Sequence, residues 1–91
     1  MTLDTFIKDP DAVLDYAVDW SDWLETGETI SSHDVTVEAG LTKDSDGESG
    51  GIVTIWLSGG TVNTSYRVAV EITTSSVRTD ERSFRVRVAE R

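Results

Sequence analysis

A two-residue repeat of apolar side chains in the second half of the chain constrains its fold most strongly. Apolar and polar residues alternate from Ser65 to Thr73 and again from Ser83 to Val88. The apolar positions are Tyr66, Val68, Val70, Ile72, Phe84, Val86 and Val88. Successive side chains of a strand point to opposite faces, so this pattern is typical of half-buried antiparallel strands. The repeat therefore predicts two strands that share one core face.

Shorter runs predict further strands. Residues 52–57 are rich in β-branched and aromatic side chains and are followed by glycines at 59–60, which predict a hairpin turn. We therefore interpret the second half as a β-meander. Residues 29–38 predict another strand. Residues 11–24 fit both helical and strand spacing, and their composition favours a strand that ends in a bend near residues 21–22.

Polar segments separate these runs. Residues 41–43 are expected to be a short extended piece, 44–51 a turn or mobile loop, and 74–82 a long polar connection. Six or seven short strands in 91 residues predict a small all-β sandwich. We assign the sandwich to residues 10–91 and an N-terminal arm to residues 1–9.

The charge of the chain argues against several classes of partner. Its 17 acidic and 8 basic residues give a net charge of −9, which disfavours nucleic acid and anionic lipid. No apolar run approaches the ~18 residues of a membrane span. Residues 1–50 carry a net −11 and residues 51–91 a net +2. This asymmetry has two interpretations. It could orient copies or partners head to tail, or the charged faces could simply be solvated.

No residue pattern predicts catalysis, a metal site or a cofactor. The chain has no cysteine, and its single histidine, His33, lies beside residues that would point to the other face of a strand. We expect His33 at the surface. Counted from Asp44, Ser49 and Ile55 stand where a calcium loop of the EF-hand type needs glycine and glutamate. A looser cation site in this segment stays open.

Two groups of residues are candidates for contacts with a partner. Tryptophans are either core residues or interface anchors. Arginines alternate with the apolar positions of the predicted strands. They form either a face with salt bridges to Glu71 or a docking patch for an acidic neighbour. The N-terminal part adds more apolar residues than one small sandwich can bury. The predicted interface residues are Phe6, Ile7, Trp20, Trp23, Leu24, Trp56, Arg67, Arg85 and Arg87.

Several segments between Lys8 and Val88 together resemble the fibre–tail adaptor family of tailed phages. The run Trp-Leu-Ser-Gly-Gly-Thr at 56–61, combined with Thr-Asp-Glu-Arg-Ser-Phe at 79–84, is the more specific part of the resemblance. The other segments are Lys8–Tyr16, Asp19–Leu24, Glu28–Ser31, Tyr66–Val68 and Ile72–Ser75. The stretch 44–51 has no counterpart. The resemblance implies an immunoglobulin-like sandwich without catalytic residues, located in the virion tail.

The family resemblance favours one function over two others. The chain is expected to be a structural virion protein that links the tail (tube, nozzle or hub) to receptor-binding fibres. Several copies would sit in a symmetric ring and would contact neither nucleic acid nor membrane. One alternative is a carbohydrate-binding module on the virion surface, using exposed tryptophans beside acidic groups. The other is a head-completion protein near the portal, with arginines of the last strand facing DNA or the portal ring.

Overall fold

The chain folds into seven β-strands. The structure is a computed structural model that describes residues 2–90, with side chains from residue 5 onward, and no helix that could cross a membrane lies within this range. The strands are β1 (Thr2–Lys8), β2 (Leu14–Asp19), β3 (Ile30–Val37), β4 (Leu41–Ser49), β5 (Ile52–Gly59), β6 (Thr64–Thr74) and β7 (Thr79–Val88). The predicted all-β fold is confirmed.

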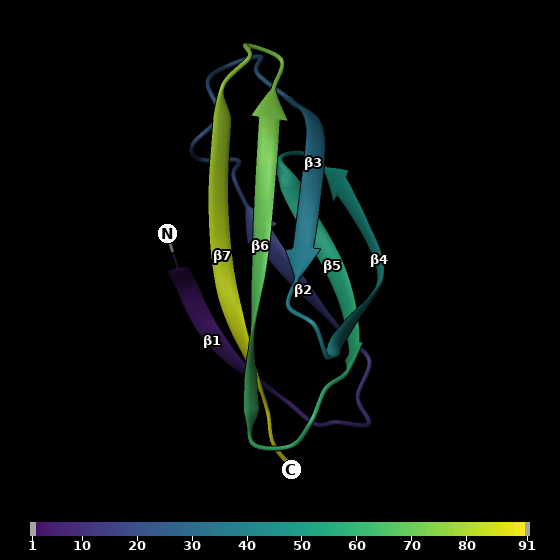
Figure 1. Cartoon of the computed structure of the whole chain (residues 1–91). Coiled ribbons are helices and arrows are strands. Elements are labelled where there is room, and N and C mark those ends of the chain that lie inside the picture. The colour runs from purple at the N-terminus through teal and green to yellow at the C-terminus, as the bar shows by residue number, and fades with distance from the viewer. Residues whose placement is uncertain (1, 91) are drawn as a thin grey trace.

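Two sheets form the layers of a sandwich. Sheet A has the strand order β1-β7-β6-β3 and sheet B the order β2-β5-β4. Figure 1 shows β7, β6 and β3 in front of β2 and β5. All neighbouring strands are antiparallel except β1, which runs parallel to β7.

Alternating side chains of the two sheets fill the space between them. In sheet A, Tyr66 lies opposite Val86 and Val68 opposite Phe84, and all four are buried. Sheet B contributes Tyr16, Val18, Trp20, Leu41, Val53, Ile55 and Leu57 to the same core. Each fully buried aliphatic side chain contributes about 1.5–3 kcal/mol through loss of contact with water. The inward face predicted for β6 and β7 is confirmed, as is a strand followed by a bend within residues 11–24.

The loop predicted for residues 44–51 is wrong, because β4 continues to Ser49 and only the turn at Gly50 and Gly51 has positive φ. This strand lies at the edge of sheet B, so a polar sequence can occupy it without burying charge. A register shift between Lys43 and Ser45 and the charged side chains along the strand are features that keep an edge from pairing with other chains.

The predicted meander is also wrong at β5. After Gly59 the chain crosses from sheet B to sheet A, so β5 and β6 are not neighbours. A Cβ atom added at Gly60, where φ is 97°, would lie 2.5 Å from Cγ2 of Val88. Glycine is therefore required here by close packing as well as by φ. The connection between β6 and β7 is a short turn closed by Arg78 O and Thr74 N at 2.8 Å, and β7 begins already at Thr79.

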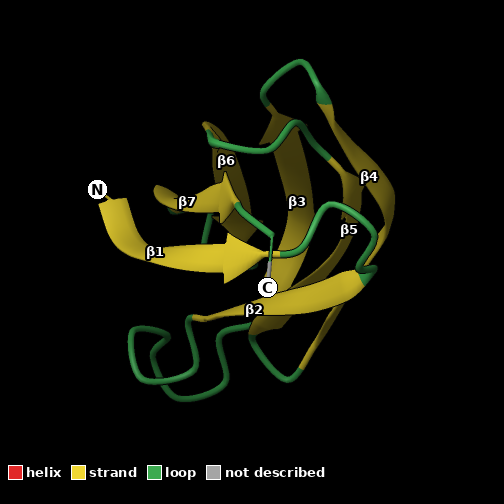
Figure 2. Ribbon diagram, turned by 90° about the horizontal axis from the view of Figure 1, so that it is seen from below, coloured by secondary structure: helices red, strands yellow, loops and turns green. Residues whose placement is uncertain are grey.

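The segment predicted to be an N-terminal arm is an edge strand in this structure. Phe6 lies opposite Val86 and Lys8 opposite Val88 in the parallel pairing of β1 with β7. Residues 9–13 then lead from sheet A to the start of β2 in sheet B, as Figure 2 shows. The division between a separable segment 1–9 and a sandwich 10–91 stays a prediction, which a truncation tests below.

Candidate partner surfaces

One end of the sandwich is held together by the carboxylate of Glu28. This buried side chain accepts hydrogen bonds from the Arg78 guanidinium, the Thr74 hydroxyl and the Glu25 backbone N–H. The Arg78 Nε atom lies 3.0 Å from Oε2 of Glu28. These donors, Arg78 first, lower the pKa of Glu28 to about 2. The network ties the segment between β2 and β3 to the turn between β6 and β7.

Two of the predicted interface residues belong to this end of the fold. Trp20 is fully buried, its Nε1–H donates to Oδ2 of Asp80 at 2.9 Å, and the Arg82 guanidinium lies 5.0 Å from its ring centre. Trp23 is half-buried beneath the Arg78 guanidinium, 3.9 Å away. Trp20 is thus unavailable to a partner in this conformation. The sequence pattern does not reveal these arginine partners because they lie more than fifty positions away.

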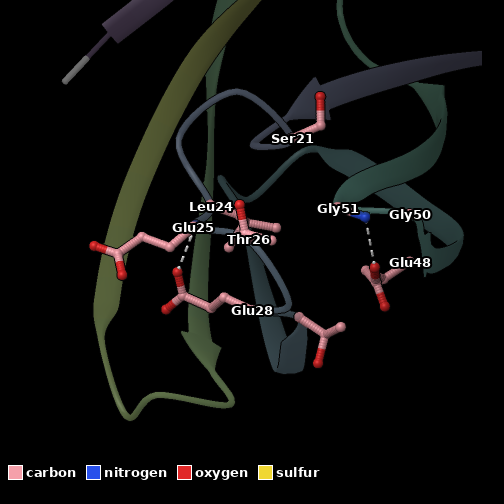
Figure 3. A pocket seen from close by; sticks show the side chains of 9 residues that line it. Ser21, Leu24, Glu25, Thr26, Glu28, Glu48, Gly50 and Gly51 are labelled. Carbon is pink, nitrogen blue, oxygen red and sulfur yellow. Dashed lines mark hydrogen bonds between the residues drawn. The ribbon is translucent and has the colours of Figure 1, made fainter.

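A cleft of about 580 Å³ lies beside this network. Figure 3 shows the residues that line it: Ser21, Leu24, Glu25, Thr26, Glu28, Thr29, Glu48, Gly50 and Gly51. The predicted interface residue Leu24 also packs against the core. Glu28 is held by Arg78, and Glu48 accepts a hydrogen bond from the Gly51 backbone. These carboxylates therefore serve the fold, and the described residues contain no group of three or more potential metal ligands.

The single histidine connects the two sheets. His33 of β3 is half-buried, and its Nε2 atom lies 2.8 Å from Oδ1 of Asp46 in β4. Lys43 donates to the other oxygen of the same carboxylate. Hydrogen bonds from Lys43 first, and then from His33, lower the pKa of Asp46. His33 therefore joins the free edges of sheets A and B at this side of the sandwich.

Apolar side chains are exposed where β1 leads into β2. We call these residues the β1–β2 corner: Phe6, Ile7, Val13 and Leu14 are 38%, 50%, 55% and 37% exposed. Phe6 lies on the core side of β1, whereas Ile7 points to the opposite face, beside Arg87. The ring of Phe6 packs against Tyr16, with 5.2 Å between the ring centres. Phe6 and Ile7 are predicted interface residues. Val13 and Leu14 are not, because apolar residues at the start of a strand give no sign of whether they are covered.

A buried lysine supports this corner. Lys8 is fully buried, and its Nζ donates to the carbonyl oxygens of Asp9 at 2.9 Å and Gly59 at 2.8 Å. Burial lowers the pKa of Lys8, and nearby carboxylates partly oppose this effect. The lysine thus joins the end of β1 to the end of β5, which fixes the position of the exposed side chains above it.

The remaining predicted residues lie on the two outer faces. Arg67 and Arg85 are direct neighbours on the outer face of sheet A, and Arg87 follows on β7. Arg67 pairs with Glu81 at 3.4 Å, not with Glu71 as expected. Trp56 is 42% exposed on the outer face of sheet B. The predicted interface residues therefore do not form one site. They divide among the end held together by Glu28, the β1–β2 corner and the two outer faces.

Exposed aromatic and arginine side chains are enriched at protein–protein interfaces, so the outer surfaces of this sandwich are candidates for contacts with other proteins. Residues 8–87 match the model of the family described as podophage GP4 fiber-tail adaptor protein gp77, and the chain belongs to this family. It is accordingly a structural protein of the phage tail with an adaptor role. The match starts at the last residue of β1 and ends at Arg87, one residue before the end of β7. The search of curated proteins found no match.

Proposed function

We propose that this protein joins the tail tube, nozzle or hub of a podophage to its receptor-binding fibres, and that it has no enzymatic activity. The observation that carries this proposal is the family match, which spans six of the seven strands. Several copies would surround the tail in a symmetric ring. An adaptor of this kind needs at least two partner surfaces, and the separate locations of the corner and the outer faces meet this need.

The proposal includes an immunoglobulin-like topology. Counted along the chain, the second, fourth and fifth strands share one sheet, and the third, sixth and seventh share the other. Constant-type immunoglobulin domains divide these strands in the same way. The first strand differs, because it joins the sheet of the seventh strand. This position leaves β1 at the edge, next to the proposed partner surface.

We assign the contact with another virion protein to the β1–β2 corner. Ile7 and Val13 are at least half exposed, and exposed apolar clusters are characteristic of interaction sites. Asp9 and Asp11 lie in the connection between β1 and β2 and would favour a basic partner surface. The apolar side chains would supply affinity, and the acidic ones would mainly affect the association rate and its salt dependence.

Imaging of intact virions by electron cryomicroscopy tests the proposed location. We expect density for this sandwich at the root of each fibre, with the β1–β2 corner against a neighbouring protein. Density at the neck between head and tail would favour a head-completion protein instead. Density at the outer surface, away from the fibre root, would favour a carbohydrate-binding module. Either of these locations would contradict the adaptor proposal.

A further inference from the structure

Trp56 differs from the other two tryptophans of the chain. Trp20 and Trp23 each lie beneath an arginine of the same chain, whereas Trp56 is 42% exposed and has no cationic group over its ring among residues 5–90. It lies on the central strand of sheet B. A large aromatic side chain in such a position is the type of residue that dominates binding energy when a partner covers it.

Trp56 has small neighbours on the outer face of sheet B, where it borders a hollow of about 350 Å³ that residues 45–49 and Thr54 also line. Across the sheet it lies between Asp15 on β2 and Ser45 on β4. The next positions on the same face are Ala17 and Gly47. None of these side chains is large enough to cover an indole ring. The outer face of sheet B therefore presents one partly exposed tryptophan with the Asp15 carboxylate beside it. We call the Trp56 side chain the knob.

The outer face of sheet A has a matching depression. We call it the arginine depression; it has a volume of about 400 Å³ and is lined by Thr36, Glu38, Arg67 and Arg85. The two arginines are direct neighbours across β6 and β7, the central strands of the sheet. Arg85 is exposed and has no carboxylate partner among residues 5–90. The depression has room for an indole ring.

The chain already contains one tryptophan that lies between a carboxylate and a guanidinium. At Trp20 the indole N–H donates to a carboxylate, Asp80, while a guanidinium, Arg82, lies over the ring. The arginine depression offers the same two kinds of group. Glu38 supplies the carboxylate, of which Oε1 accepts the backbone N–H of Arg67 at 2.8 Å. Guanidinium groups over tryptophan are among the more favourable cation–π pairs.

We propose that Trp56 of one copy inserts into the arginine depression of a neighbouring copy, so that sheet B of one packs on sheet A of the next. This inference rests on the proposed function, in which several copies occupy one tail. The charges fit: Asp15 accompanies the tryptophan, and Arg85 and Arg87 accompany the depression. The molecule extends 43 Å along its longest axis and about 20 Å across, which allows the ~800 Å² per partner of a standard interface.

The two surfaces of this contact are different, so the interface is heterologous. A copy that presents its knob to one neighbour still offers its depression to another. Heterologous contacts generate rings when the rotation between copies closes and open stacks when it does not. The proposal therefore gives a physical basis for a ring of copies around the tail.

Sedimentation velocity of the full chain over a wide concentration range tests the contact. We expect the wild type to self-associate. Trp56→Ala should weaken self-association roughly 30-fold, the effect of losing one anchor residue. The double variant Arg67→Glu/Arg85→Glu should have a similar effect. Val77→Ala is the matched control, because it shortens an apolar side chain that is 83% exposed in the turn between β6 and β7. Circular dichroism verifies that each variant is folded.

Mixing the two variants distinguishes this geometry from others. Trp56→Ala keeps its depression and Arg67→Glu/Arg85→Glu keeps its knob, so together they should form a one-to-one dimer and nothing larger. A wild type that stays monomeric overturns the proposal, as does self-association that Trp56→Ala leaves unchanged. A mixture without dimers would also contradict the proposal, because it would show that Trp56 and the arginine depression do not bind each other. Quenching of Trp56 emission by soluble glycans, in a monomeric wild type, would assign this face to carbohydrate. None of these results bears on the fibre-root location, which imaging tests separately.

Discussion

At the scale of single residues, Glu28 carries the clearest prediction. Its pKa of about 2 lies below the usual 4.5, so the folded state favours the ionised carboxylate more than the unfolded chain does. The stabilisation is therefore fully present above pH 4.5 and is lost as the pH falls towards 2. We expect the difference in melting temperature between the wild type and Glu28→Gln to be several degrees at pH 7 and to shrink on acidification.

Thermal melts monitored by circular dichroism between pH 2 and pH 7 measure this difference. Glu71→Gln is the control, because its side chain is exposed on the outer face of sheet A. A difference between wild type and Glu28→Gln that is independent of pH would contradict the role assigned to the ion pair with Arg78.

At the scale of elements, the register of β6 determines what lies in the core. Val70 is fully buried and lies opposite Val35 and Arg82. Val70→Asp would bury a charge with no partner, so we expect a loss of more than ~4 kcal/mol, a large part of the stability of a small domain. Ser65→Asp, on the outer face of the same strand, should change stability little. Urea denaturation measures both, and equal midpoints would show that the inward face is assigned wrongly.

Local patterns explain why β6 and β7 are predictable from sequence and other elements are not. The apolar alternation of β6 and β7 reports burial directly, since every second side chain faces the other sheet. β4 shows no such alternation, because an edge strand needs few buried side chains. β1 is held by pairing with the far end of the chain, and residues 2–8 alone do not encode that contact. The arginines over Trp20 and Trp23 are equally remote in sequence.

Removal of β1 tests whether residues 10–91 fold independently of the N-terminal segment. A chain lacking residues 1–7 keeps Lys8 and its bonds to Asp9 and Gly59 but loses the Phe6 ring. Each aromatic pair of Phe6, with Tyr16 and with Phe84, contributes about 0.5–1.5 kcal/mol. Lost burial and lost pairing with β7 add to these contributions, so we expect a folded protein that is at least ~1–3 kcal/mol less stable in urea denaturation. A truncated chain without a cooperative transition would show that β1 is an integral part of the sandwich.

At the scale of the whole molecule, the two kinds of surface have different physical character. The β1–β2 corner is apolar with acidic neighbours, whereas the outer faces combine one tryptophan with paired arginines. The corner lies where the chain passes from one sheet to the other, and the outer faces lie on the central strands (Figure 1). Ile7 lies beside Arg87 and so borders both surfaces, but Val13 lies in the connection between the sheets. A substitution at Val13 should therefore leave the contact through the outer faces intact.

This separation predicts the behaviour of a corner variant. In Val13→Asp, one exposed apolar side chain becomes charged, so the fold should persist and self-association should match that of the wild type. Binding to the neighbouring virion protein should weaken by roughly 30-fold or more, because the apolar contact is lost and charge is added to an interface that must be desolvated. Quantitative mass spectrometry of particles assembled with this variant should therefore find little of the chain.

Val77→Asp is the matched control: it adds the same charge at the opposite end of the sandwich, at a residue with φ of 61° that aspartate tolerates. Normal incorporation of the corner variant would move the docking surface to the outer faces. Loss of incorporation in both variants would show that added negative charge, and not the corner, prevents assembly.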